Sequence, residues 1–116
     1  MKIYLAGKIT GDPEYKRKFA QAAEVYGGTE DAPNAILNPA ELPEGMEPGD
    51  YMRVCLAMID ACDVAVFLPD WQRSAGAQIE RAYCRYVGKT VVDYPEALWT
   101  ETGAGSAGES RGERGR

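Results

Sequence analysis

Four short apolar runs punctuate the chain, and a glycine or proline closes each of them. They are "KIYLA" before Gly7, "NAILNP" ended by Pro39, "DVAVFLP", and "TVVDY" before Pro95. Short apolar runs bounded by such residues are typical of buried strands. The run "DVAVFLP" is continuous and rich in β-branched residues, which favours a strand covered on both faces of its sheet.

Between these runs, apolar residues recur at helical spacing. The segment from Glu14 to about Tyr26 has an apolar face made of Tyr15, Phe19, Ala22, Ala23 and Tyr26. Its Lys and Arg residues, Lys18 among them, fall elsewhere on the helix. Pro13 suits a first-turn position, and Gly27 with Gly28 marks the end of the helix.

Two further helices follow from the same periodicity. The second is predicted from Asp50, acting as its N-cap, to about Ala61. The third begins after Ser74 and runs to about Val87, where Gly88 stops it. The segment "PAELPEGMEPGD", which precedes the second helix, is predicted to be a loop because of its Pro and Gly residues.

Strands that alternate with helices of ten or more residues predict right-handed crossovers and a parallel sheet. We therefore expect an α/β fold, a three-layer α/β/α sandwich of flavodoxin-like or Rossmann-like order with four or five parallel strands. Residues 1–100 are predicted to form this single domain. Residues 101–116 are Gly-rich, have no apolar residue larger than alanine, and are predicted to be a disordered tail.

Composition and charge narrow the classes of function. The net charge is −5, and the tail holds three acids and three arginines, so the excess of acid lies on the folded part. This argues against binding a nucleic-acid polymer, which needs clustered Lys and Arg. No run of about 18 apolar residues and no signal peptide is found, so we expect a cytoplasmic protein without membrane contact.

The residue types also limit the chemistry. The chain has no histidine, which excludes a Ser-His-Asp triad and any His-ligated zinc site. The three cysteines, Cys55, Cys62 and Cys84, form no CxxC pair and are predicted to be core residues in a reducing compartment. We expect neither a metal nor a cofactor, so acid and base chemistry would rest mainly on carboxylates, tyrosines, lysines or cysteines.

The candidate site lies where two strand-to-helix loops are expected to meet. Open α/β sheets bind ligands beyond the carboxyl ends of their strands, where neighbouring connections diverge. If the first and third strands are neighbours, the loops "GKITGDP" and "PDWQRSAG" form the two walls of one crevice. The first loop would offer an anion the residues Gly7, Lys8, Ile9, Thr10 and Gly11. Alternatively, its glycines only turn the chain.

The second loop and the helix after it have two interpretations as well. Ser74 and the free N–H groups of the first turn can bind an anion, with Gly76 allowing close approach, or Ser74 is an ordinary cap. Asp70 and Trp71, at the tip of the loop, can hold a base, or Trp71 simply packs on the core. Glu80 shares the helix face of Gly76 and faces the crevice, or it is a solvated charge.

Four segments carry a resemblance: "IYLAGKITG", "LNPAELP", "DYMRVCLAMIDACDVAVFLPDW" and "SAGAQIERAYCRYVGKTVV". Over residues 2–94 the chain resembles an uncharacterised bacterial and phage domain family of the nucleoside 2-deoxyribosyltransferase-like superfamily. That superfamily includes deoxynucleoside monophosphate N-glycosidases. The resemblance implies that Glu80 is a nucleophile at the anomeric carbon and that Tyr4 orients it. It also implies that Ser74, Gly76 and the first loop hold a 5′-phosphate, and that the protein forms a homodimer or higher homo-oligomer.

The same resemblance leaves more than one function open. The expected activity is that of an N-glycosidase or deoxyribosyltransferase acting on a nucleoside or nucleoside 5′-monophosphate. Active members usually carry an aspartate where this chain has Cys55, and Lys8 and Thr10 replace a typical serine and arginine. Since a thiol lacks the charge and paired acceptors of a carboxylate, an inactive nucleotide-binding or sensing module, such as a phage-encoded one, is the alternative. A third hypothesis is an interaction protein with a vestigial crevice.

Overall fold

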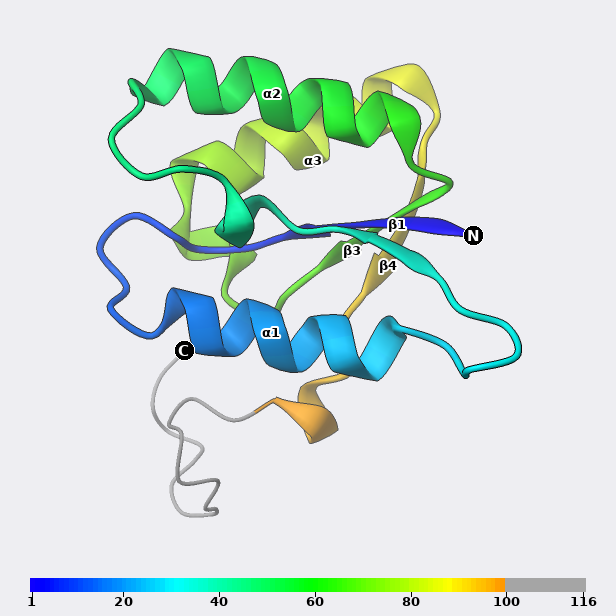
Figure 1. Ribbon diagram of the computed structural model, residues 1–116. Coiled ribbons are helices and arrows are strands. Elements are labelled where there is room, and N and C mark those ends of the chain that lie inside the picture. Colours follow the sequence, from blue (N-terminus) through cyan, green and yellow to red (C-terminus); the bar gives the residue numbers. More distant parts are fainter. Residues whose placement is uncertain (100–116) are drawn as a thin grey trace.

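The computed structural model describes residues 1–99 and shows a sheet with helices on both sides (Figure 1). The strands are β1 (Lys2–Ala6), β2 (Ala35–Leu37), β3 (Val64–Phe67) and β4 (Thr90–Asp93). They lie in the order β2-β1-β3-β4, and every neighbouring pair is parallel. The predicted α/β class and parallel sheet are confirmed, with four strands in the described residues.

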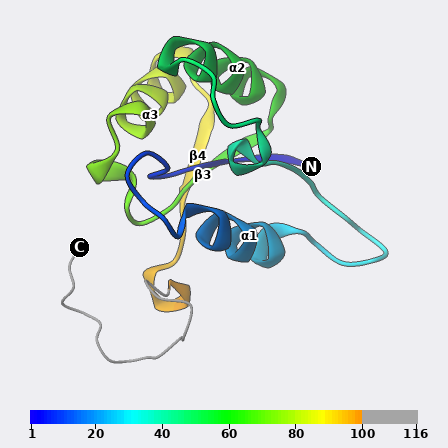
Figure 2. The same cartoon turned by 60° about the vertical axis from the view of Figure 1, so that its left-hand side comes forward.

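Within residues 1–99, three helices and three short 3-10 turns complete the fold. The helices are α1 (Tyr15–Tyr26), α2 (Pro48–Ala61) and α3 (Ala75–Val87). The turns are η1 (Pro39–Glu41), η2 (Trp71–Arg73) and η3 (Glu96–Leu98). Helix α1 covers one face of the sheet, and α2 and α3 lie side by side on the other, as two views agree (Figures 1 and 2).

The two faces of the sheet carry separate apolar cores, because successive residues of a strand point to opposite sides. On the α1 side, Leu5 and Val66 pack with Phe19. On the other side, Tyr4 and Phe67 pack with residues of α2 and α3. Tyr4 is therefore fixed on the face that α3 covers.

The chain segments that leave the neighbouring strands β1 and β3 pass to opposite faces of the sheet. From β1 the chain turns through α1 to β2, whereas from β3 it turns through α3 to β4 on the opposite side. Ligands of open α/β sheets bind at such a point. The first and third strands are adjacent in the sheet, as predicted. They pair from Ile3 opposite Val64 to Ala6 opposite Phe67.

Several predicted helix ends are confirmed. Ser74 caps α3 by accepting a hydrogen bond from the N–H of Ala77 at 3.1 Å. Gly88 ends α3 in the left-handed conformation, with φ of 78°, and α1 ends at Tyr26 before the two glycines.

Other predicted boundaries were wrong. Helix α2 begins at Pro48, not after Asp50, because proline fits the first helical position and Glu47 takes the cap position. Asp50 lies in the first turn instead. Helix α1 begins at Tyr15, so Pro13 lies before its cap. The predicted loop after β2 contains the turn η1, where Asn38 accepts a hydrogen bond from Ala40.

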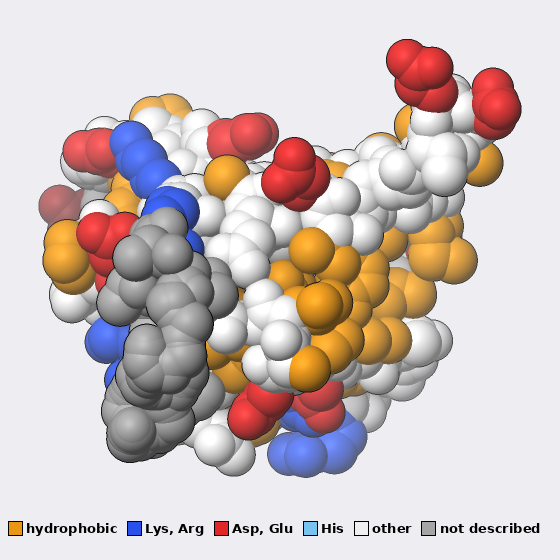
Figure 3. All heavy atoms as spheres, turned by 90° about the horizontal axis from the view of Figure 1, so that it is seen from below, with side chains coloured by type: hydrophobic (Ala, Val, Ile, Leu, Met, Phe, Trp, Pro, Cys, Tyr) orange, Lys and Arg blue, Asp and Glu red, His pale blue; other side chains and the backbone are white. Residues whose placement is uncertain are grey.

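The surface on the α1 side is mixed in character. Hydrophobic side chains gather in one area of this face, with acidic side chains around it (Figure 3). No helix within residues 1–99 is long and apolar enough to cross a membrane. The predicted tail, residues 101–116, lies outside the described part of the chain.

Candidate functional site

The two predicted loops lie against each other at the carboxyl ends of β1 and β3. The N–H of Leu68 donates to the carbonyl of Ala6 at 2.8 Å, which extends the pairing beyond the strands. The N–H of Lys8 then donates to Asp70 Oδ1 at 3.1 Å. The ammonium of Lys8 donates to the carbonyls of Thr10 and Arg73, at 3.0 and 3.4 Å. The structure thus brings the two loops together as the sequence predicted.

Gly7 is needed because the second loop comes very close to it. A Cβ atom at this position would lie 3.0 Å from Asp70 Oδ1 and 3.0 Å from the Cβ of Leu68. Both distances are tighter than ordinary carbon contacts, so a larger residue would push the loops apart.

Asp70 is buried, contrary to the prediction that it stands at a loop tip. Its side chain is 1% exposed and binds the N–H of Lys8 through Oδ1, while Oδ2 has no hydrogen-bond partner. Desolvation by burial raises the pKa of this carboxyl, and the hydrogen bond from Lys8 opposes that rise. Asp70 therefore joins the two loops from beneath.

Lys18, which helical spacing places off the apolar face of the first helix, lies in the same buried cluster. Its ammonium lies 2.9 Å from Asp12 Oδ2 and 3.9 Å from Asp70 Oδ2, and the residue is only 5% exposed. Burying an unpaired ammonium is costly, so a buried lysine normally lies close to carboxylates that offset its charge. The cluster ties α1 to both loops.

Glu80 is buried on the other side of the sheet and is hydrogen-bonded to Tyr4. The hydroxyl of Tyr4 donates to Glu80 Oε1 at 2.9 Å, and the two residues are 0% and 7% exposed. Glu80 shares the inward face of α3 with Ala77 and Cys84. Cys55 of α2 lies in the same buried cluster as Tyr4 and Cys84. The two predicted catalytic residues are thus in direct contact, with a thiol beside them.

Burial perturbs the acidity of this group of side chains. Desolvation raises the pKa of Glu80 to about 7, even though the hydrogen bond from Tyr4 and the nearby Cys55 thiol act to lower it. Desolvation also raises the pKa of Cys55 to about 11, and that of Tyr4 well above its usual value. Near neutral pH, Glu80 therefore exchanges between acid and carboxylate, a property of general acids, bases and carboxylate nucleophiles.

Several backbone donors lie near the meeting loops. The Ser74 side chain is used by Ala77, whereas the N–H groups of Ala75 and Gly76 have no protein acceptor within residues 1–99. The same holds for the N–H groups of Thr10 and Gly11 in the exposed part of the first loop. Free donors at a helix start suit an anion.

Two predicted loop residues have structural partners of their own. The N–H of Lys8 is occupied by Asp70, and Ile9 packs against the core on the α1 side. The backbone donor of Lys8 is therefore already used.

Trp71 is held by a residue that the sequence did not single out. Its ring packs edge-on against Phe67 at a centroid distance of 5.9 Å, and the Arg81 guanidinium lies 4.4 Å from its centroid. Arg81 also forms an ion pair with Asp93 at 2.6 Å. No local spacing predicts this group, because Trp71, Arg81 and Asp93 come from three different elements.

No group of three or more Cys, Asp or Glu residues in the described chain is arranged to hold a metal ion. A model of the family described as "Domain of unknown function (DUF4406)" matches residues 1–93. The chain therefore belongs to this family. No curated protein and no solved structure matches it.

Proposed function

We propose that this member of the DUF4406 family acts on the N-glycosidic bond of a nucleoside or nucleoside 5′-monophosphate, with Glu80 as the nucleophile. One observation carries the proposal: a buried glutamate on α3 is hydrogen-bonded at 2.9 Å to a buried tyrosine of β1. This pair lies next to the strands whose connections diverge, where such sheets bind ligands. A buried carboxyl with a perturbed pKa is common at catalytic sites, and a role as a nucleophile is consistent with its burial.

The proposed reaction has two balanced steps. In the first, a carboxylate oxygen of Glu80 bonds to the anomeric carbon while the carbon–nitrogen bond breaks, and the electron pair of that bond leaves with the base, which takes up a proton from solvent. In the second, water attacks the same carbon and gives up one proton to solvent, while the bond to Glu80 breaks, which releases Glu80 as a carboxylate and yields the free sugar or sugar phosphate. A second base in place of water gives transfer. This follows the logic of retaining glycosidases.

Tyr4 would orient Glu80 for this attack. Its hydroxyl donates to one carboxylate oxygen, which leaves the other available to the substrate. The free N–H groups of Gly76 and Gly11 and the ammonium of Lys8 supply donors of the kind that a 5′-phosphate requires.

A second candidate, a nucleotide-binding module without turnover, is favoured by one specific observation. Cys55 lies in the same buried cluster as Tyr4, and desolvation raises its pKa to about 11, which keeps the thiol protonated at neutral pH. A protonated thiol donates a hydrogen bond but brings no charge to the developing positive sugar. Such a site would hold a nucleotide without promoting loss of the base.

The test is to incubate the protein with a panel of nucleosides and 5′-monophosphates, to follow free base by chromatography and to measure binding by calorimetry. Base release that disappears in Glu80→Gln and persists in Glu24→Gln, an exposed glutamate of α1, supports the enzyme. Binding without release supports the module. Release that is unchanged in Glu80→Gln contradicts the proposed mechanism.

A further inference from the structure

Residues 94–99, which follow β4, pack on the α1 side of the sheet (Figure 1). Tyr94 is 2% exposed, and its ring centroid lies 6.0 Å from that of Tyr26 in α1. The ring of Trp99 packs edge-on against Tyr94 at a centroid distance of 5.7 Å. Gln21, also in α1, donates a hydrogen bond to a backbone carbonyl of the segment at 2.9 Å. The segment is therefore attached to α1 by aromatic packing and by a hydrogen bond.

Trp99 places its ring over the buried ammonium of Lys18. The Nζ atom lies 5.5 Å from the ring centroid, within the range of a cation–π interaction. The same ammonium lies 2.9 Å from Asp12 Oδ2 and 3.9 Å from Asp70 Oδ2, and Lys18 is 5% exposed. Both kinds of attraction are stronger where water is excluded, because the effective dielectric constant is lower there. The ring therefore adds to the attraction that holds the ammonium beside the two carboxylates.

The two carboxylates in turn hold the first loop. Asp12 Oδ1 accepts a hydrogen bond from the N–H of Glu14 at 2.9 Å, and the N–H of Asp12 donates to the carbonyl of Ile9 at 3.1 Å. Asp70 Oδ1 accepts a hydrogen bond from the N–H of Lys8 at 3.1 Å. The part of the loop that carries the candidate anion donors lies between these attachments. Its position therefore depends on carboxylates that share one ammonium.

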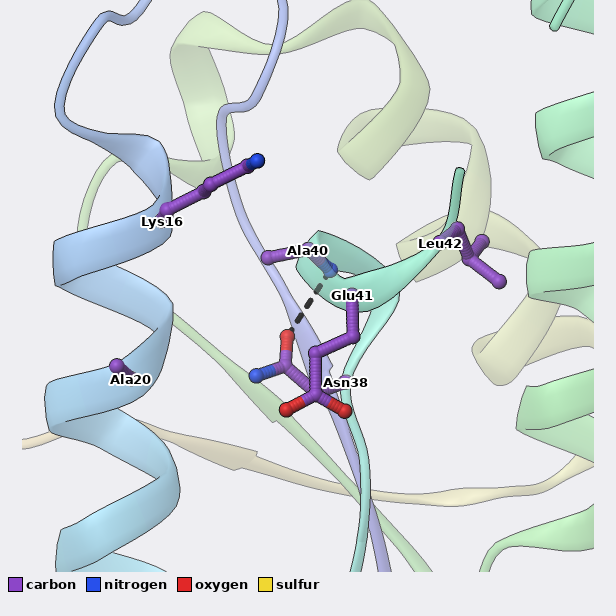
Figure 4. A pocket seen from close by; sticks show the side chains of 6 residues that line it. All are labelled: Lys16, Ala20, Asn38, Ala40, Glu41 and Leu42. Atoms are coloured by element: carbon purple, nitrogen blue, oxygen red, sulfur yellow. Dashed lines mark hydrogen bonds between the residues drawn. The ribbon is translucent and has the colours of Figure 1, made fainter. Parts of the chain in front are cut away.

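Lys16, a second lysine of α1, makes the same two kinds of contact at the surface. It extends toward η1 at a surface hollow that Asn38 also lines (Figure 4). Its ammonium lies 2.8 Å from Glu44 Oε2 and 5.9 Å from the ring centroid of Tyr15, but its side chain is 61% exposed. Such contacts contribute little free energy in water. Lys16 therefore provides a matched control for the buried group around Lys18.

We propose that Trp99 is a positioning residue for the first loop, and that residues 94–99 are thereby coupled to ligand binding at that loop. With the ring in place, Lys18 keeps Asp12 and Asp70 fixed; without it, water would reach the ammonium and the loop would loosen. By linkage, a ligand that binds the ordered loop must favour the packed segment by the same factor. The class of ligand, an anion such as phosphate, rests on the proposed function, whereas the ordering of the loop does not.

The first test is amide hydrogen exchange of the full chain without ligand. Trp99→Leu keeps an apolar side chain but removes the ring, whereas Trp99→Phe keeps a ring. We expect the N–H groups of Lys8 and Asp12 to exchange about tenfold faster in Trp99→Leu, and close to the original rate in Trp99→Phe. The N–H of Lys89, which donates to the carbonyl of Cys84 at 2.8 Å, should exchange as before. Equal acceleration at all three N–H groups, or none at Lys8 and Asp12, would overturn the proposal.

The second test is a titration with inorganic phosphate, followed by NMR at the N–H of Gly11. We expect saturable shifts in the original protein and in Lys16→Met, and binding about tenfold weaker in Trp99→Leu. Equal binding by the original protein and Trp99→Leu would overturn the coupling. If the original protein does not bind phosphate but exchange at Lys8 is faster in Trp99→Leu, the proposed anion site and the coupling are wrong, and the positioning role of Trp99 is supported.

Discussion

The hydroxyl of Tyr4 lies 2.9 Å from Glu80 Oε1, and this hydrogen bond joins residues that are 76 positions apart in the chain. Tyr4 lies in the middle of β1, and Glu80 lies in the second turn of α3. Since both are buried, water does not compete for the contact. The contact therefore fixes the depth of α3 on the sheet as well as the direction of the carboxylate.

Replacing Tyr4 by phenylalanine should cost the folded protein about 1.5–3 kcal/mol, because the buried carboxyl loses a donor that water does not replace. It should also raise the pKa of Glu80 further, since the tyrosine hydrogen bond acts to lower it. Urea denaturation measures the first effect, and a ¹³C NMR titration of the carboxyl measures the second. Tyr86→Phe, at a residue that is 91% exposed, is the matched control and should change neither. Equal effects of the two substitutions would contradict the role of the hydrogen bond.

The titration of Glu80 should also make stability depend on pH. Its pKa is about 7 in the folded protein and close to 4.5 when unfolded, so between these pH values only the folded state retains the proton. The contribution of Glu80 to the free energy of unfolding should therefore be largest below pH 4.5 and should be lost as pH rises through about 7, by about 3 kcal/mol in all.

Glu80→Gln isolates this effect, because glutamine stays neutral throughout. The difference in free energy of unfolding between the original protein and the variant should fall across the same interval and level off above it. A difference that stays constant from pH 4.5 to 8 would show that Glu80 titrates with an ordinary pKa.

The buried ammonium of Lys18 leads to a larger expected loss. Lys18→Met leaves Asp70, which is 1% exposed, without its nearby cation, and should destabilise the protein by about 3–5 kcal/mol. Combining it with Asp70→Asn should recover part of that loss, which a double-mutant cycle of urea denaturation measures. Lys2→Met breaks only an exposed pair with Asp63 and should cost at most about 1 kcal/mol. If Asp70→Asn does not reduce the loss in free energy of unfolding, Lys18 does not stabilise the protein through its charge beside Asp70.

The sequence predicted the layers of the fold well because the strands are apolar runs closed by glycine or proline, and the helices are clearly amphipathic. Helix starts were harder to locate, since Pro48 and Asp50 both carry signals for a first turn and only one frame is adopted. The burial of Lys18 was not predictable for a different reason. Helical periodicity places it beside Phe19, but the two acids that draw it inward come from separate loops.

Only those parts of the candidate site that depend on spacing within one helix or loop were predictable from the sequence. Four residues from Gly76 to Glu80 make one turn of helix, which is enough to align the two on α3. The position of Cys55 near Glu80, in contrast, depends on how α2 packs beside α3. The stacking of Arg81 on Trp71 similarly depends on the path of the η2 turn. Such contacts between elements have no signature in a single sequence.

Gly7→Ala should loosen the two loops. The added methyl group would lie 3.0 Å from Asp70 Oδ1 and from the Leu68 Cβ, so one of them must move, at a cost of about 1–3 kcal/mol. Gly49→Ala is the control, because its Cβ would lie 3.5 Å from Arg53 Nη1, an ordinary contact within α2. That change should be neutral or slightly stabilising. Thermal unfolding compares the two, and an unaffected Gly7→Ala would mean that the loops are less closely packed than their distances indicate.

The three cysteines should be protected from alkylation in the folded protein. All three are free and buried, and desolvation raises the pKa of Cys55 and Cys84 to about 11. Thiolate is the reactive form, so at pH 8 a pKa of 11 instead of 9 lowers the reactive fraction about 100-fold, before burial limits access. We expect iodoacetamide to modify none of them in the folded protein within the time that labels all three in urea, as mass spectrometry would show. Rapid labelling of Cys55 alone in the folded state would contradict this prediction, and would mean that its thiol is less protected than its burial and raised pKa indicate.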